Sequence, residues 1–192
     1  MLTTITITFG LFLKIRGAIS LIIAEFFFTS SRRVSPGFWV LIGEKLAVNP
    51  TSVHAYIVGE HGDSELALWS TAAIGNTLID KYRKLSEREK KQIFEAAKNA
   101  AYAIIAGKQA TYYAIASGIR QIVRTIMFDQ RTVLPVSHLF NGEYGIHDIC
   151  LSMPAIVGAK GVIQKVNPAI SAKEKSQLQK SAAKLKQVAK NL

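Results

Sequence analysis

The sequence predicts an α+β fold in which an antiparallel sheet packs with long helices. Two stretches with helical periodicity, residues 86–128 and 171–192, flank residues 132–166, where apolar residues alternate as they do in strands. An Asn-Gly pair at 141–142 is a strong hairpin signal, so neighbouring strands should run antiparallel. The order is therefore helices, a meander and a final helix, rather than an alternation of parallel strands and helices.

The length and composition are those of a folded domain. The chain has 192 residues, which is enough for one domain with a core or for two small ones. It carries 24 Lys and Arg against 13 Asp and Glu, a net charge of +11, yet 49% of its residues are hydrophobic, which argues against disorder. The single cysteine, Cys150, cannot form an internal disulfide, so we expect a reducing compartment, the cytoplasm.

Residues 1–39 form an atypical apolar leader with two hydrophobic runs, at 2–13 and 17–28. Neither run reaches the roughly 20 apolar residues of a membrane-spanning helix. The first basic residues follow the first run, whereas a secretory signal places them before it. Membrane association of the leader is therefore only an alternative, and we expect the folded domain to occupy residues 40–192.

Four elements are predicted at the start of this domain. Residues 41–48 have helical spacing, and an Asn-Pro pair ends that helix. Residues 53–58 are β-rich and predict a strand, which leads into a glycine-bracketed loop at 59–65. A helix is expected over residues 66–79.

Two capping boxes mark the starts of the long helices. Ser86 with Glu89 opens a helical stretch that extends to about residue 128, with a break or bend expected near Gly107. Ser171 with Glu174 opens the terminal helix. The apolar stripe of that helix consists of Leu178, Ala182, Leu185, Ala189 and Leu192.

The meander between these helices contains two predicted hairpins. Residues 132–140 alternate as a strand, and residues 145–153 return after the Asn-Gly turn. Residues 154–157 and 162–166 flank a short glycine-bracketed turn and form the second hairpin candidate.

His61 is the candidate catalytic residue, since it lies in the loop after the first strand beside several carboxylates. Histidine donates and accepts protons near neutral pH, and the nearby Glu60, Asp63 and Glu65 would raise its pKa. On these residues alone His61 is a candidate general acid or base, with a plain surface histidine as the alternative.

Other chemistries have weaker support. His54, His61, Asp63 and Glu65 lack a helix-borne ligand pair and a cysteine cluster, so no metal site is expected. Cys150 is interpreted as a small residue of a buried strand. The lysines of the terminal helix have no aromatic residues among them and fit a solvated face, so no nucleic-acid partner is expected.

Residues 53–70, VHAYIVGEHGDSELALWS, closely resemble the active-site segment of the L-lactate dehydrogenases. Three later blocks are also similar to that family, in particular to its bacterial members, and they occur in the same order. These blocks are AAYAIIAGKQATYYAIA, VLPVSHLFNGEYGIHDICLSMPAIVGAKGV and QKSAAKLKQV. The resemblance covers residues 40–192 and implies the C-terminal, substrate-binding and catalytic half of a lactate/malate dehydrogenase. The Glu before the His favours lactate or another 2-hydroxy acid over malate.

The resemblance also implies a mechanism and its residues. His61 would donate a proton to the ketone oxygen of pyruvate while NADH delivers hydride. Thr111 would line the substrate pocket near the nicotinamide. His54 would help to bind fructose 1,6-bisphosphate at a subunit interface, as in allosteric bacterial members. The family implies NAD as cofactor, a small 2-hydroxy or 2-keto acid as substrate, and homo-oligomers or association with full-length dehydrogenase subunits.

One family motif is absent from this sequence. Aligned without gaps from His61, the upstream Asp and two Arg of the family fall on Val34, Gly37 and Trp39, none of which can replace them. No glycine-rich, pyrophosphate-binding motif follows a strand, so we expect no Rossmann domain and no cofactor-binding residues. Our hypothesis is that residues 1–39 are out-of-frame or unrelated sequence.

We therefore expect a truncated family member that is inactive alone. The alternatives are a non-catalytic remnant or oligomer-interaction module, and a relative that acts on malate or another L-2-hydroxy acid.

Overall fold

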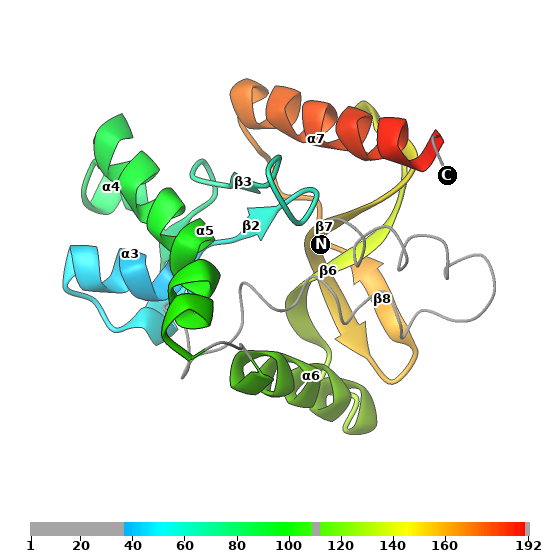
Figure 1. Ribbon diagram of the computed structural model, residues 1–192, viewed down its shortest axis with the longest axis horizontal. Helices are drawn as coiled ribbons and strands as arrows, with labels where there is room; N and C mark the ends of the chain where they lie inside the picture. The colour runs from blue at the N-terminus through cyan, green and yellow to red at the C-terminus, as the bar shows by residue number, and fades with distance from the viewer. Residues whose placement is uncertain (1–36, 109–111, 191–192) are drawn as a thin grey trace.

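The computed structural model describes residues 37–108 and 112–190, with the side chains of 101–108 and 112–115 outside the description. Long helices surround a three-stranded sheet (Figure 1). All strand pairings in these ranges are antiparallel, so the described part contains no doubly wound parallel sheet. The predicted α+β class is confirmed.

The main sheet has the order β6-β7-β8. Its strands are β6 Thr132–Asn141, β7 His147–Gly158 and β8 Gly161–Lys165. Both predicted hairpins are present, and the short 3-10 helix η2 Glu143–Gly145 lies in the first turn. The two middle segments of the prediction form one continuous strand, β7, in which Pro154 faces Pro135 of β6.

Two long helices pack at opposite ends of the β6–β7 pair. Helix α6 Tyr112–Met127 contributes Ile122 to a cluster with Leu134 and Val157, near the start of β6. Helix α7 Ala172–Lys190 contributes Leu178 to a second cluster near the end of β6. In Figure 1, α7 lies above the sheet and α6 below it.

A third cluster lies beside the sheet. It includes buried residues of α3 Phe38–Leu46, of the short α4 Ile79–Tyr82, of α5 Glu87–Lys108 and of the segment 53–72, while the 3-10 helix η1 Pro50–Ser52 contributes no buried residue. The fully buried Phe38 and Ile42 of α3 pack in this cluster with residues of α4 and α5. The predicted first helix is therefore present, and it begins earlier than the spacing indicated.

The helix expected over residues 66–79 is wrong. This segment contains β3 Leu66–Ala67, β4 Ala73–Ile74 and β5 Thr77–Leu78 before α4 begins. The backbone groups of β3 and β4 pair with earlier strands, so they are not available for a helical ladder. Gly75, with φ of +57°, lies in the turn between β4 and β5.

The predicted strand at 53–58 is divided into β1 Val53–His54 and β2 Ile57–Val58. The two pieces belong to different small sheets, β1-β4-β5 and β2-β3. The predicted break near Gly107 falls where α5 ends at Lys108 and α6 begins at Tyr112, and the three residues between them are outside the description.

Some sequence predictions concern residues that are not described. The leader up to residue 36, with Val34, and Thr111 and Leu192 all lie outside the described ranges. Gly37 and Trp39 are described: Gly37 is the N-cap of α3, and Trp39 packs against the cluster that contains Phe38 and Ile42. Within the described ranges, no helix combines the length and apolar character needed to cross a membrane.

Candidate functional site

The loop at residues 59–65 is attached to the main sheet at its start. Gly59 follows β2, and its N–H and C=O exchange hydrogen bonds with Ser152 of β7, each with an N–O distance of 3.0 Å. Gly59 has φ of +98°, a conformation that favours glycine. This bridge places the loop over the central strand.

Helix α7 holds the other side of the loop. The backbone N–H of Glu60 donates to Ser181 Oγ at 2.8 Å, and Ser64 Oγ lies 3.2 Å from the same oxygen. The hydroxyl and the N–H of Ser64 both donate to Glu60 Oε2. Lys184 of α7 adds ion pairs with Glu60 at 3.8 Å and Asp63 at 3.7 Å. The loop is therefore fixed between a strand and a helix.

His61 lies in the middle of this loop. Its side chain is 34% exposed, and its Nδ1 is 3.9 Å from Oε2 of Glu65, whose side chain is only 5% exposed. Burial lowers the pKa of His61, and the charge of Glu60 acts in the opposite direction. The imidazole is thus reachable from solvent and beside a buried carboxyl group, an arrangement that suits proton transfer.

Glu65 itself has an unusual pKa. Burial raises the pKa of this carboxyl group to about 7, against the attraction of Lys98, and the charges of Glu60, Asp63 and Glu95 raise it further. A group with this pKa exchanges its proton near neutral pH.

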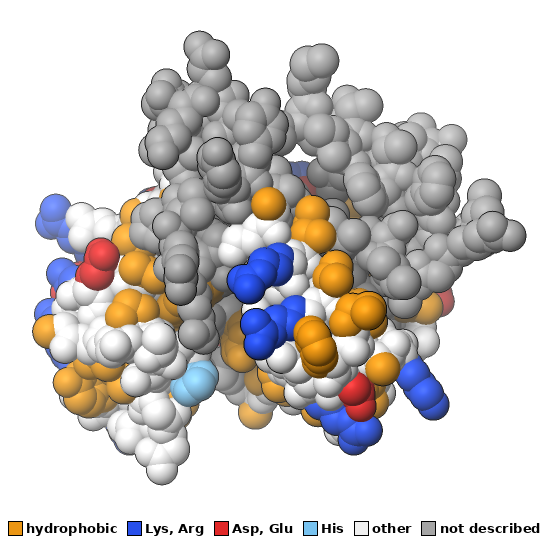
Figure 2. All heavy atoms as spheres, turned by 90° about the horizontal axis from the view of Figure 1, so that it is seen from below, with side chains coloured by type: hydrophobic (Ala, Val, Ile, Leu, Met, Phe, Trp, Pro, Cys, Tyr) orange, Lys and Arg blue, Asp and Glu red, His pale blue; other side chains and the backbone are white. Residues whose placement is uncertain are grey.

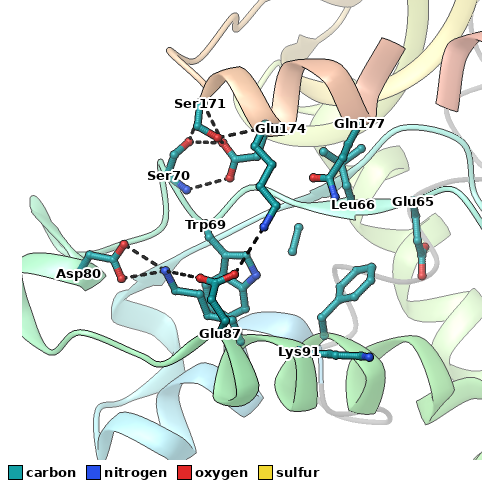
Figure 3. Close-up of a pocket in the computed structure, with 14 residues that line it drawn as sticks. Glu65, Leu66, Trp69, Ser70, Asp80, Glu87, Lys91, Ser171, Glu174 and Gln177 are labelled. Carbon is teal, nitrogen blue, oxygen red and sulfur yellow. Dashed lines mark hydrogen bonds and ion pairs between the residues drawn. The ribbon is translucent and has the colours of Figure 1, made fainter. Parts of the chain in front are cut away.

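An open cleft of about 550 Å³ lies next to the loop, between the start of α5 and the start of α7 (Figure 3). Glu65 lines it at one side, Trp69 lines its apolar wall, and Glu87 and Lys91 approach from α5. His61 does not line this cleft. Sequence reasoning identified both capping boxes but gave no sign that the two helix starts meet at one cleft.

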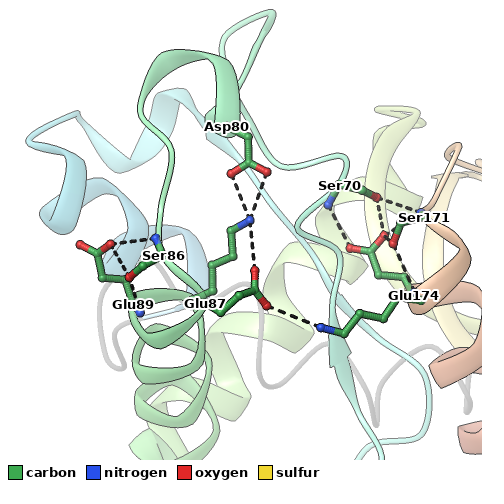
Figure 4. A network of polar contacts seen from close by, with 9 residues as sticks. Ser70, Asp80, Ser86, Glu87, Glu89, Ser171 and Glu174 are labelled. Atoms are coloured by element: carbon green, nitrogen blue, oxygen red, sulfur yellow. Dashed lines mark hydrogen bonds and ion pairs between the residues drawn. The ribbon is translucent and has the colours of Figure 1, made fainter.

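Polar contacts connect the elements around this cleft (Figure 4). Lys90 lies 3.0 Å from Asp80 and 3.8 Å from Glu87, and Lys173 of α7 lies 3.5 Å from Glu87. Ser70 donates through its N–H, at 2.9 Å, and through its hydroxyl to the Glu174 carboxylate. The segment after the loop is therefore also bound to α7.

His54 lies apart from the His61 loop in the topology. It is exposed at the end of β1, where it faces Ala73, whereas the loop follows β2. Within the described ranges, no three His, Cys, Asp or Glu side chains converge as metal ligands. Cys150 is half-buried in β7, opposite Leu139 of β6. Thr111 lies outside the described residues.

Two buried polar side chains were missed by sequence reasoning. Ser181 is fully buried and contacts the loop. Its place next to Ala182 of the predicted apolar stripe was the signal that could have indicated its burial. His138 of β6 is 7% exposed and stacks on Phe140 with ring centroids 5.2 Å apart. Neither of its ring nitrogens has a hydrogen-bond partner among the described residues. Alternation along β6 was the only available signal for its burial.

Comparison with known proteins identifies the fold and its relatives. The model of the lactate/malate dehydrogenase α/β C-terminal domain matches residues 37–192. An L-lactate dehydrogenase of Acetivibrio thermocellus is 42% identical over 160 residues, which are 81% of this chain and 50% of that protein. One from Clostridium botulinum is 44% identical over 78% of this chain and 49% of its own length.

Solved structures agree with these matches. The ligand-bound crystal structure of the minor L-lactate dehydrogenase from Enterococcus mundtii has a TM-score of 0.75 and 42% identity, covering 81% of this chain and 51% of that one. The L-lactate dehydrogenase from Clostridium thermocellum has a TM-score of 0.72 and 41% identity, covering 81% and 52%. This chain spans about half the length of the relatives it matches.

Proposed function

Because this chain belongs to the lactate/malate dehydrogenase family through its α/β C-terminal domain, we propose that it serves the interconversion of pyruvate and lactate, with His61 as the acid and base. The observation that carries this proposal is the geometry of residues 59–65. A half-exposed imidazole is held in a loop that is fixed on both sides, 3.9 Å from a buried carboxyl group.

The proposed role of His61 is proton transfer to and from the substrate oxygen. In the direction of pyruvate reduction, the imidazolium donates its proton to the ketone oxygen, and in the reverse direction the neutral ring accepts a proton from the hydroxyl group of lactate. Burial favours the neutral ring, so the imidazolium is a ready proton donor, and the charge of Glu60 opposes the loss of that proton.

The family uses NAD, which supplies and accepts the hydride when bound. The described residues do not fit the pyrophosphate of this cofactor, because they contain no glycine-rich turn between a parallel strand and a helix. The proposal therefore assigns only the substrate side of the reaction to the matched domain, residues 37–192.

A complementation assay tests the proposal. The purified chain is mixed with a full-length lactate dehydrogenase subunit whose active-site histidine has been replaced, and NADH oxidation with pyruvate is followed. We expect activity with the native chain and none with His61→Asn. The matched control is His147→Asn, which changes an exposed histidine outside the loop and should keep the activity.

Activity that is equal with His61→Asn would refute the role of His61. A folded native chain that restores no activity would refute the catalytic proposal and favour a non-catalytic module.

Two further residues belong to the same proposal by family resemblance. Thr111 would line the substrate pocket, and His54 would contribute to a fructose 1,6-bisphosphate site. The exposed position of His54 at the end of β1 is compatible with a contact to a charged effector. Thermal stabilisation by fructose 1,6-bisphosphate that disappears in His54→Asn would support this role, and equal stabilisation of both forms would contradict it.

A homo-oligomer is the proposed assembly. Its support is an exposed apolar patch at the end of α6, where Val123 is 50%, Met127 74% and Phe128 73% exposed. Figure 2, which views the molecule from below, shows hydrophobic side chains beside basic ones on the side where Figure 1 places α6. A second copy of the chain would remove these side chains from water.

A further inference from the structure

The His61 loop and the segment after it are bound to α7 at two points on one face of the helix. Glu174 binds Ser70, and Ser181, seven residues further along, binds Glu60. Seven residues are about two turns, so the two side chains lie roughly 10 Å apart on the same side of α7. Leu178, between them, is fully buried.

Of the hydrogen bonds between α7 and the loop, the one made by Ser181 lies directly beside His61 in sequence, whereas Lys184 reaches the loop by ion pairs. Ser181 is fully buried. Its Oγ accepts the N–H of the residue just before His61, at 2.8 Å, and lies 3.2 Å from the hydroxyl of Ser64. The Ser64 hydroxyl donates its proton to Glu60, so the proton between the two serines comes from Ser181. A single hydroxyl therefore joins both sides of the loop.

The backbone of the loop lies very close to the Ser181 hydroxyl at Gly59. A Cβ at Gly59 would lie 2.9 Å from Ser181 Oγ, closer than real Cβ contacts, and Gly59 also has φ of +98°. The loop can approach α7 this closely because residue 59 has no side chain. The position of His61 thus depends on a short, defined distance between the loop and the helix.

We infer that Ser181 is a positioning residue for His61, which fixes the loop on α7 and thereby sets the burial of the imidazole and its distance from Glu65. This inference rests on the proposed role of His61. A hydroxyl that only stabilised the fold would change the stability of the chain and leave the environment of the imidazole as it is.

The experiment follows the His61 imidazole by NMR titration of the full chain, with Ser181→Ala as the variant. Loss of the hydroxyl should loosen the loop and expose the ring, so the pKa of His61 should rise toward its ordinary value. Hydrogen exchange of the Glu60 amide should become at least about tenfold faster, since the amide loses its acceptor.

Ser176→Ala is the matched control, because Ser176 is an exposed serine of the same helix. It should change neither the titration nor the exchange. If Ser181→Ala does not fold, Ser181→Cys fills the site with a slightly larger side chain, replaces the hydroxyl by a weaker hydrogen-bonding thiol and is measured in the same way.

A variant that is less stable but has an unchanged His61 titration would overturn the inference. The readout needs no turnover, so it is independent of the complementation assay. If the complementation assay fails but Ser181→Ala still shifts the titration of His61, the result would count against the proposed function and leave the positioning role in place.

Discussion

Glu65 and Glu174 are both largely buried, yet their surroundings move their pKa values in opposite directions. Burial dominates at Glu65 and raises its pKa to about 7. At Glu174 burial also acts to raise the pKa, but hydrogen bonds from Ser70 and Ser171 outweigh it, and the pKa is lowered. The number of donors around each carboxylate, rather than burial alone, decides which form the fold prefers.

Glu65→Gln should stabilise the chain above neutral pH. The pKa of Glu65 is raised from 4.5 to about 7 in the folded state, so the fold loses stability as the pH rises from the unfolded value through the folded one. An uncharged side chain of the same shape removes this penalty. We expect a gain of roughly 1 to 3 kcal/mol at pH 8 and little change at pH 4, measured by urea unfolding.

Glu44→Gln provides the control for this prediction, since it removes an exposed carboxyl group from α3 that does not act on the pKa of Glu65. An equal effect of Glu65→Gln at both pH values would show that the Glu65 carboxyl is not held in its neutral form.

His138→Leu should weaken the acid sensitivity of the chain. Burial and the charge of Lys165 lower the pKa of His138, and the backbone of Leu139 and the charge of Glu143 act in the opposite direction. The fold therefore prefers the neutral ring, and its stability falls as the pH drops below about 6.5, the unfolded value. In thermal unfolding, the melting temperature of the variant should therefore fall less steeply between pH 6.5 and pH 5 than that of the native chain.

The exposed His147 gives the matched comparison, and the melting temperature of His147→Leu should depend on pH as that of the native chain does. An equal pH dependence of the native chain and His138→Leu would contradict the prediction.

At the scale of elements, α7 connects the His61 loop to the sheet. Its buried stripe packs Leu178 and Ala182 against Leu151 and Met153 of β7. Glu174 in its first turn serves two elements, because it closes the capping box with Ser171 and also accepts two hydrogen bonds from Ser70. A capping residue is thus also a tertiary contact.

Glu174→Gln should destabilise the chain by roughly 1 to 3 kcal/mol at pH 7, because an amide nitrogen would face donors that now meet a carboxylate oxygen. The pKa of Glu174 is lowered in the fold, so its contribution is present above the unfolded value of 4.5 and is lost as the pH falls through the folded one. Urea unfolding at pH 7 and pH 3 measures both effects.

Ser70→Ala gives the comparison, because it removes the hydroxyl that donates to Glu174 and leaves the capping box of Ser171 and Glu174 in place. This variant should have a smaller effect at pH 7 than Glu174→Gln. An unchanged stability of Ser70→Ala would show that the contact of the Ser70 hydroxyl adds nothing to the cap.

Elements were predicted well where local pattern and tertiary pairing agreed. The Asn-Gly turn and the alternation of residues 132–140 both favoured the β6–β7 hairpin, which is present. In residues 66–79 the apolar residues have helical spacing, but backbone pairing with β1 and β2 and the turn at Gly75 override it. Pro135 and Pro154 face each other, which is possible only at a position without ladder hydrogen bonds between them.

At the scale of the whole molecule, the described residues form three apolar clusters, and the His61 loop bridges from β2 to α7 beside one of them. Lys184 and Lys173 of the basic helix α7 form ion pairs with the loop and with α5. Part of the excess positive charge thus meets carboxylates within the molecule.

Substitution of the α6 patch tests the proposed homo-oligomer. Met127→Gln with Phe128→Gln removes two side chains that are 74% and 73% exposed. If a second copy covers them, the dissociation constant for self-association should rise by at least about tenfold, because apolar burial is lost. Sedimentation velocity of the full chain at several concentrations measures it.

The matched control places the same change elsewhere, as Leu78→Gln with Tyr82→Gln, which are 45% and 54% exposed. A native chain that stays monomeric, or equal effects of the two double variants, would contradict an interface at α6.

The sequence by itself determined the fold class, the two long capped helices, the hairpin and the loop that carries His61, because each depends on residues close together along the chain. The tertiary structure alone decided the division of residues 53–79 into short strands, and the contact of Ser181 with Glu60 across 121 positions. Only the folded chain shows which carboxyl groups are buried and which donors surround them. That balance sets the pKa of Glu65 and Glu174, and it depends on residues from elements that are distant in sequence.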